Sequence, residues 1–331
     1  MKSHIAVVGA GSWGTTVAST VAQNQSTMLW ARRAELAKQI TTQHENIDYL
    51  RGSALTESLS CSSNLQDVVS DASIVMMAVP SNGFRDVLVE VAKYVSPRVP
   101  IVSLTKGLER DTLKRMTEVV ADVLPRHCVA VLTGPNLAHE ILAGQPAATV
   151  VGCDDDEIAK QIQVLLTRPT LRVYTNPDVV GCEIGGVVKN VIAIAAGIVE
   201  GMGFGDNSKA TLITRGLAEM SRLGVALGAN PTTFTGLAGI GDVVATCASA
   251  QSRNTAVGVR LGKGESITSI TASMKMVAEG VKSSLSVLQL AQRCKVDMPI
   301  TEQVAAVCEG TISAKDSLVR LMSRVSKAEL D

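Results

Sequence analysis

A glycine pattern near the beginning of the chain constrains the fold more than any other feature. Residues 4–8 form a strand-like run that is apolar from Ile5 to Val8. Gly9, Gly11 and Gly14 follow at GxGxxG spacing, and apolar residues at helical spacing come next. Gly9 permits a tight turn, Gly11 lets a pyrophosphate approach the backbone, and Gly14 lets the helix pack against the strand. Because the pattern lies between a strand and a helix, it predicts dinucleotide binding, with a structural glycine turn as the alternative.

β-rich runs alternate with helical patterns through the first half of the chain, which predicts a mainly parallel sheet covered by helices. We expect strands at 4–8, 27–30, 73–79, 100–104, 129–133, 147–151 and 172–174, and helices that include 14–23, 34–41, 84–95 and 113–124. Polar or basic loops follow several of these strands, at 9–11, 80–82, 105–107 and 134–136. Ligands bind at the carboxyl ends of parallel strands, so these loops predict one site.

The pattern changes after the turn at Asn176 and Pro177, where β-rich runs stop and long helical segments begin. We therefore expect a Rossmann-type α/β domain over residues 1–178 and an all-α substrate-binding and catalytic domain over residues 179–331.

Lys plus Arg and Asp plus Glu both number 31, so the protein has no overall positive electrostatic field that would attract nucleic acid or an anionic membrane. The composition indicates a soluble protein. The apolar run 191–199 has nine residues, about half of a bilayer crossing. Seven scattered cysteines are typical of reduced thiols, so we expect a cytoplasmic location. The acidic run 154–157 precedes a helical pattern and favours a helix first turn over a metal site. We expect no metal.

The end of the second predicted strand carries Arg32 and Arg33, where NAD-specific proteins usually have an acidic residue for the ribose 2′-hydroxyl. A guanidinium suits a 2′-phosphate, so the pair favours NADPH, with NADH also possible. The alternative is that one or both arginines are ordinary surface residues.

One charged residue interrupts the apolar segment 184–199, which is apolar around the whole helix and predicts a buried helix. Lys189, with Asn190 beside it, must find partners there or lose its proton more easily. Such a lysine is a usable general acid or base. The alternative is a side chain that extends to the surface.

The same helix carries the residues of a known family. The segment from Gly186 through Lys189 and Asn190 to Asn207 resembles the signature of NAD(P)-dependent glycerol-3-phosphate dehydrogenases. The resemblance is strongest to the bacterial members of that family. Further similar motifs follow in the right order, at 105–108, 134–135, 214–224, 237–242, 251–254, 277–280 and 298–302.

The resemblance implies the activity and the substrate site. The activity is the reversible interconversion of dihydroxyacetone phosphate and sn-glycerol 3-phosphate, with Lys189 as general acid and base. Lys106 and Asp242 are implied as further catalytic residues that also bind substrate. The other implied substrate contacts are Gly134, Asn136, Asn190, Thr246, Ser252, Arg253 and Asn254.

The resemblance also implies cofactor contacts beyond the glycines, at Ser12, Trp13, Arg32, Arg33, Lys106, Ala138, Arg253, Val277 and Glu279. Five positions depart from the family pattern: Asn136 stands where Ser or Thr is common, and His139 where Lys or Arg is usual. The other three are Val187, in place of a smaller residue, and Asp206 and Lys209, in place of the commoner Ala and Arg. Three roles have structural alternatives: Asp242 as a helix cap, Thr246 bonded to its own helix, and Glu279 as a surface charge.

Two other functions remain open from the residues. A β-hydroxyacid-type dehydrogenase also uses a helical lysine, but that family has Asn where this chain has Ala193. A non-catalytic NADPH sensor would need the glycines but not Lys106, Lys189 and Asp242 together. The resemblance further implies a homodimer and a role in glycerophospholipid synthesis.

Overall fold

An eight-stranded sheet organises the first half of the protein, in a computed structural model that describes residues 3–274, 278–326 and 328. Its strands are β1 (His4–Val8), β2 (Thr27–Trp30), β3 (Leu59–Ser62), β4 (Ala72–Met77), β5 (Ile101–Ser103), β6 (Val129–Thr133), β7 (Ala147–Cys153) and β8 (Leu171–Asn176). The order is β3-β2-β1-β4-β5-β6-β7-β8. Neighbours run parallel, except that β6 and β7 are antiparallel. Strand order reverses between β1 and β4, where such sheets bind ligands.

Helices cover both faces of this sheet because its strands are buried on both sides. Ile5 and Val7 pack with α1, α2 and α7, whereas Ala6 and Val8 pack with α3, α4 and α5, as the two-residue period of a strand requires. The helices of this half are α1 (Ser12–Ala22), α2 (Ala34–Gln43), α3 (Leu65–Val69), η1 (Ser81–Gly83), α4 (Phe84–Val91), α5 (Met116–Val123), α6 (Ala138–Leu142) and α7 (Asp156–Leu166).

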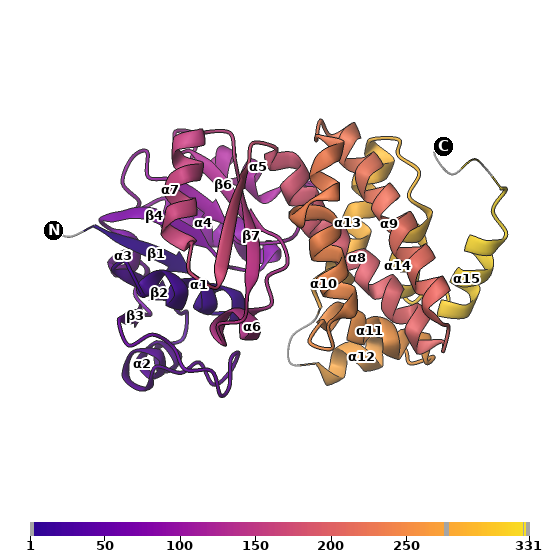
Figure 1. Ribbon diagram of the computed structural model, residues 1–331, viewed down its shortest axis with the longest axis horizontal. Helices are drawn as coiled ribbons and strands as arrows, with labels where there is room; N and C mark the ends of the chain where they lie inside the picture. Colours follow the sequence, from indigo (N-terminus) through magenta and orange to yellow (C-terminus); the bar gives the residue numbers. More distant parts are fainter. Residues whose placement is uncertain (1–2, 275–277, 327, 329–331) are drawn as a thin grey trace.

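Helices are the only regular elements in the described part of the second half, which lies beside the sheet with α15 at its far side (Figure 1). They are α8 (Val179–Gly201), α9 (Asp206–Ala226), η2 (Pro231–Thr235), η3 (Leu237–Gly241), α10 (Asp242–Ala248), α11 (Arg253–Gly262), α12 (Ile267–Ser273), α13 (Glu279–Arg293), α14 (Pro299–Cys308) and α15 (Ala314–Met322). The predicted fold class, a Rossmann-type sheet domain with an all-α second part, is confirmed.

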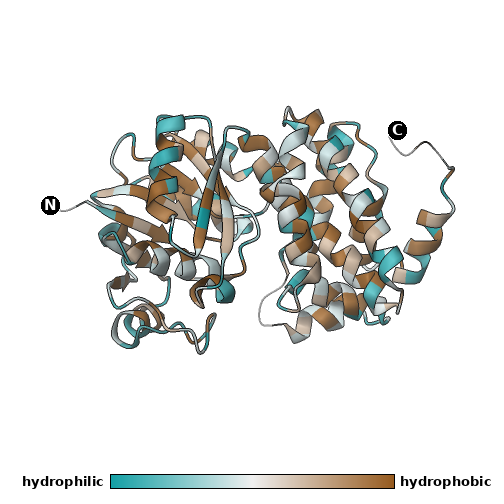
Figure 2. Cartoon of the chain, viewed as in Figure 1, coloured by the Kyte–Doolittle hydropathy of each residue, from teal (hydrophilic) through white to brown (hydrophobic). Residues whose placement is uncertain are grey.

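Helix α8 is the core of the helical half. It has 23 residues and a mean hydropathy of 1.7, enough in length and composition to cross a membrane, but 94% of its apolar window is buried inside the fold. The predicted burial of this helix is therefore confirmed. Helix α11 packs directly on α8, because Gly197 and Gly258 leave no side chain between the two backbones. Apolar residues are concentrated in the strands and along α8 (Figure 2).

A buried carboxylate connects the two halves. Glu183 of α8 accepts hydrogen bonds from the Arg115 guanidinium at 2.8 Å and from the Thr117 backbone N–H at 3.0 Å. Both donors lie at the beginning of α5, so this contact fixes α8 against the sheet domain.

Two local predictions were wrong. The strand β3 was not predicted, because its sequence Leu-Ser-Cys-Ser has little β propensity and the strand forms by pairing with β2. The helix expected from residue 113 begins at Met116, because Leu113 has a positive φ of 60° and ends a turn instead.

The acidic run at 154–157 behaves as predicted: Asp155 caps α7 by accepting from the N–H groups of Glu157 and Ile158.

Candidate active site

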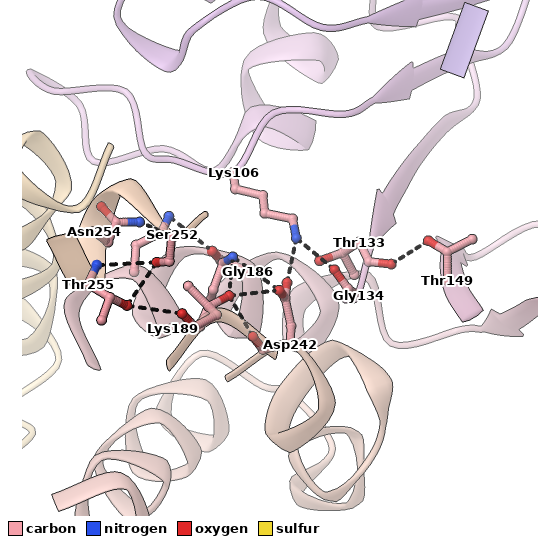
Figure 3. A network of polar contacts seen from close by, with 12 residues as sticks. Lys106, Thr133, Gly134, Thr149, Gly186, Lys189, Asp242, Ser252, Asn254 and Thr255 are labelled. Atoms are coloured by element: carbon pink, nitrogen blue, oxygen red, sulfur yellow. Dashed lines mark hydrogen bonds and ion pairs between the residues drawn. The ribbon is translucent and has the colours of Figure 1, made fainter. Parts of the chain in front are cut away.

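Three charged side chains from distant parts of the sequence meet between the sheet and the helical half. Lys106 follows β5 at the carboxyl edge of the sheet, Lys189 lies in the middle of α8, and Asp242 begins α10. Figure 3 shows Lys106 reaching from the sheet toward Gly134 and Asp242. The sequence-predicted catalytic residues are therefore brought together.

The Asp242 carboxylate lies between the two ammonium groups. Its Oδ1 is 3.0 Å from the Lys189 Nζ, and its Oδ2 accepts a hydrogen bond from the Lys106 Nζ. Lys106 also donates to the Gly134 carbonyl at 2.9 Å. Lys189 donates to the Thr246 hydroxyl at 2.8 Å, and this hydroxyl donates to the Asp242 carbonyl at 2.6 Å. Each ammonium thus has one anionic and one neutral partner.

Burial sets the electrostatics of this cluster. The exposed fraction of the side chain is 2% for Asp242, 11% for Lys189 and 18% for Lys106. Burial lowers the pKa of Lys106 to about 8, and the positive charge of Lys189 acts in the same direction, while Asp242 opposes it. Burial would raise the pKa of Asp242, but the two lysine charges outweigh it and hold that pKa below its ordinary value. Asp242 is therefore an anion at neutral pH.

The structure bears on three of the alternatives for single residues. Asp242 does not cap its helix with its side chain, since Gly241 occupies the N-cap position and the carboxylate faces the lysines. Thr246 does bond back to its own helix, and the same hydroxyl also accepts from Lys189. Lys189 is buried rather than extended to the surface.

The beginning of helix α11 lies next to this cluster. Ser252 caps the helix by accepting from the Thr255 N–H at 3.2 Å. Asn254 donates to the Asn190 side-chain oxygen at 2.9 Å and accepts from the Gly280 N–H at 2.9 Å, which links α8, α11 and α13. The Arg253 side chain is exposed and has no ion-pair partner among the described residues. A helix N-terminus with a free guanidinium suits an anion.

The glycine loop has the shape that a dinucleotide needs. Gly9 has a φ of +119°, and a Cβ there would lie 2.5 Å from the Ala78 carbonyl oxygen. A Cβ on Gly14 would lie 2.0 Å from the Gly9 carbonyl oxygen, whereas one on Gly11 would meet nothing within 4 Å. The chain is therefore tightly packed at Gly9 and Gly14 and open at Gly11, as the glycine pattern predicts.

Several buried polar atoms have no partner within the described part of the chain. They include the indole N–H of Trp13, both amide atoms of Asn136 and the hydroxyl of Thr133. Trp13 lies in the glycine loop, Thr133 precedes Gly134, and Asn136 lies two residues after Gly134. Buried polar groups are normally hydrogen-bonded, so these orphans fit contacts to a bound cofactor or substrate.

The remaining predicted cofactor residues lie around the same edge. Ser12 begins α1 and Ala138 begins α6. Glu279, the first residue of α13, accepts a hydrogen bond from Ser81 at 2.8 Å, so it is not a free surface charge. Val277 lies outside the described residues.

The two arginines after β2 differ. Arg33 forms an ion pair with Asp48, whose carboxylate raises the pKa of that guanidinium, whereas Arg32 is exposed and has no ion-pair partner among the described residues. His139, which departs from the family pattern, is exposed, and its Nδ1 lies 3.3 Å from the Ser53 hydroxyl.

Sequence reasoning missed three polar residues at this site. Ser81, Asn46 and Asp48 all contact segments predicted to hold the cofactor. Ser81 is in one of the predicted strand-end loops, which was the available signal. Asn46 and Asp48 belong to an irregular segment without a recognisable pattern.

Comparison with known proteins agrees with this geometry over most of the chain. Residues 4–159 match the family described as NAD-dependent glycerol-3-phosphate dehydrogenase N-terminus, and residues 178–319 match the corresponding C-terminus. The chain belongs to this family. The family resemblance predicted from the sequence is thus confirmed, as is its class, an NAD(P)-dependent dehydrogenase.

Individual relatives are similar over nearly their full length. "Glycerol-3-phosphate dehydrogenase [NAD(P)+] 2" of Sphingopyxis alaskensis is 52% identical over 316 residues, which cover 96% of this chain and 95% of that protein. "Glycerol-3-phosphate dehydrogenase [NAD(P)+]" of Corynebacterium glutamicum is 50% identical and covers 98% and 99%. The crystal structure of glycerol-3-phosphate dehydrogenase from Coxiella burnetii has a TM-score of 0.93 at 34% identity and covers 97% and 99%.

Proposed function

We propose that this protein catalyses the reversible reduction of dihydroxyacetone phosphate to sn-glycerol 3-phosphate with a nicotinamide dinucleotide. The observation that carries the proposal is the Lys106–Asp242–Lys189 cluster at the carboxyl edge of a dinucleotide-binding sheet. The names of the relatives, which are glycerol-3-phosphate dehydrogenases, support the same substrate pair.

Residues Gly9, Gly11, Ser12, Trp13 and Gly14 would hold the cofactor, which supplies the hydride for carbonyl reduction when bound. The protein itself supplies the proton and the positive charge that stabilises the developing alkoxide. Lys189 Nζ carries a proton that it can give to the alkoxide oxygen as negative charge develops there, and Asp242 holds this ammonium in place. Lys106 adds a second positive charge and orients the carbonyl oxygen. In the reverse direction, Lys189 takes the proton back as a base.

The substrate phosphate belongs at the beginning of α11. Ser252, Arg253 and Asn254 offer a hydroxyl, a guanidinium and an amide there, and the helix N-terminus adds its partial positive charge. Gly134, which contacts Lys106, Thr246, which contacts Lys189, and Asn190, which contacts Asn254, would complete the substrate contacts together with Asn136. In this arrangement Asn136 uses its unpartnered amide as a substrate contact.

On the cofactor side, NADPH is proposed as the preferred reductant, with NADH also used. Arg32 is the guanidinium free to meet a 2′-phosphate, while Arg33 must first leave Asp48. Lys106, Ala138, Arg253, Val277 and Glu279 complete the proposed cofactor contacts.

The wider assignments are also proposals. The last strand ends at Asn176 and α8 begins at Val179, which supports a domain boundary at residue 178. A homodimer, a cytoplasmic location and a role in glycerophospholipid synthesis follow from the family. All seven cysteines are free thiols, as a reducing compartment would keep them.

Loss of NADPH absorbance tests the proposed reaction directly. The protein should oxidise NADPH with dihydroxyacetone phosphate, more slowly with NADH, and not with a β-keto acid. Turnover of the β-keto acid alone would indicate a β-hydroxyacid-type dehydrogenase. Cofactor binding without turnover of either substrate would indicate a sensor.

Lys189→Ala should lower kcat by about three orders of magnitude or more, because it removes the proton donor and its charge. The NADPH dissociation constant should stay within about threefold, since the glycine loop is untouched. Lys160→Ala, at an exposed lysine of α7, is the matched control and should keep normal kcat. A turnover number near that of the unmodified protein would refute the role of Lys189.

Replacing both Arg32 and Arg33 by Ala should raise the Kd for NADPH by about tenfold or more and change the Kd for NADH much less, because only NADPH carries the 2′-phosphate. Calorimetric titration with both cofactors measures the difference. Equal losses would mean that neither guanidinium reads the 2′-phosphate. The single substitutions should differ, with Arg32→Ala the more damaging because Arg33 already has Asp48 as a partner.

The pH profile of the reduction should report Lys106. Its pKa is lowered to about 8, so the ammonium is present below this pH and lost as pH rises through it. We therefore expect kcat/KM for reduction to fall above about pH 8, approaching tenfold per pH unit. In Lys106→Arg the decline of kcat/KM should move to higher pH, whatever the absolute value of kcat/KM in that variant, because arginine stays charged. An unchanged alkaline limb in that variant would contradict the assignment.

A further inference from the structure

The segment 44–58, which connects α2 to β3, contacts the cofactor region at three places that the proposed site does not explain. Asn46 reaches the glycine loop, Asp48 pairs with Arg33, and Ser53 lies 3.3 Å from His139 of α6. The segment is internally braced, since Glu45 and Ala54 form an antiparallel bridge and Leu50 is fully buried. It can therefore hold these side chains in fixed positions.

Asn46 is the most informative of the three. Its exposed fraction is 0%, and its amide nitrogen donates to the Ala10 carbonyl at 3.0 Å and to the Thr15 hydroxyl at 2.8 Å. Ala10 lies between Gly9 and Gly11, and Thr15 is in the first turn of α1. One hydrogen of this buried amide is thus used on the dinucleotide loop and the other on the helix that follows it. The Asn46 side-chain oxygen has no partner among the described residues.

The peptide plane gives this contact a consequence for the cofactor. The Ala10 carbonyl and the Gly11 N–H belong to one trans peptide unit and point in opposite directions. By holding the carbonyl, Asn46 also fixes the direction of the N–H. No described residue accepts a hydrogen bond from the Gly11 N–H, and the space beside Gly11 is open. A pyrophosphate oxygen is the acceptor that this donor suits.

We propose that Asn46 is a positioning residue for the dinucleotide: its amide holds the Ala10–Gly11 peptide so that the Gly11 N–H points at the pyrophosphate before the cofactor arrives. The inference rests on the cofactor site of the proposed function. Asn46 is distant from the glycine pattern in the sequence and is not part of that motif. It would act by orienting the backbone and not by contacting the cofactor itself.

Asn46→Ala tests the proposal by binding rather than by turnover. The Kd for NADPH should rise by about tenfold, the worth of one well-placed hydrogen bond to an anion, while kcat at saturating cofactor stays within about twofold. Adenosine 2′-monophosphate lacks the pyrophosphate, so its Kd, measured by calorimetry, should change by less than about twofold. The difference between the changes in these two dissociation constants distinguishes the loss of a fixed peptide orientation from a general loosening of the domain.

Ser19→Ala is the matched control. Ser19 anchors the same segment to the same helix by accepting from the Thr56 N–H at 2.9 Å, but it does not contact the glycine loop. Its removal should leave both dissociation constants unchanged. An NADPH Kd raised equally in Ser19→Ala and Asn46→Ala would overturn the proposal, as would an unchanged NADPH Kd in folded Asn46→Ala.

Thr15→Val decides the question if Asn46→Ala does not fold. It removes one of the two Asn46 acceptors with little change of shape, and a weaker NADPH Kd with unchanged adenosine 2′-monophosphate binding would support the proposal. An unaltered NADPH Kd would count against it. An unmodified protein that binds NADPH without reducing dihydroxyacetone phosphate would defeat the proposed reaction but not this inference, whereas one that binds neither NADPH nor NADH would defeat both.

Discussion

The ion cluster around Asp242 is the constraint on which the site depends. Removing a carboxylate or an ammonium from water is costly, and an isolated buried lysine in an apolar helix would be strongly destabilising. Here one carboxylate, 2% exposed, contacts two ammonium groups, and Gly134 and Thr246 satisfy further hydrogens. Because Lys106 comes from the sheet and Lys189 from α8, the same contacts also set the distance between the two halves.

The cluster explains how a protein with no net charge can bind two anionic ligands. Two ammonium groups and one carboxylate leave a local excess of one positive charge, which is shielded from solvent and therefore weakly screened. The N-terminus of α11 lies beside it, where the Thr255 hydroxyl donates to the Thr246 carbonyl at 3.0 Å, and the glycine loop follows β1 as Lys106 follows β5, at the same carboxyl edge of the sheet. Positive charge is thus concentrated where the proposed phosphates would lie.

Features of the structure that depend on a local sequence pattern could be predicted. Features that depend on packing between distant segments could not. The glycine spacing, the strand-end loops and the apolar helix around Lys189 each carry a local signal, so the sheet, the site edge and the buried lysine were predictable. The family resemblance, rather than spacing, brought in Asp242 and the α11 residues. Strand β3 and the contacts of Asn46 and Asp48 arise from packing between segments up to 36 residues apart, and no periodicity in 44–58 indicates them.

Helix α1 shows how the surrounding structure prepares this charge pattern. Its N-terminus begins at the glycine loop, where the partial positive charge of a helix favours a phosphate. At the other end, the Arg168 guanidinium donates to the Thr20 carbonyl at 2.6 Å and to the Val21 carbonyl at 3.5 Å. A cation there stabilises the negative end of the helix, and burial lowers the pKa of that guanidinium without removing its charge. The C-terminal end of α1 thus has a partner within the protein, whereas the Gly11 N–H at its other end has no acceptor among the described residues, so a bound dinucleotide would complete the helix at that end.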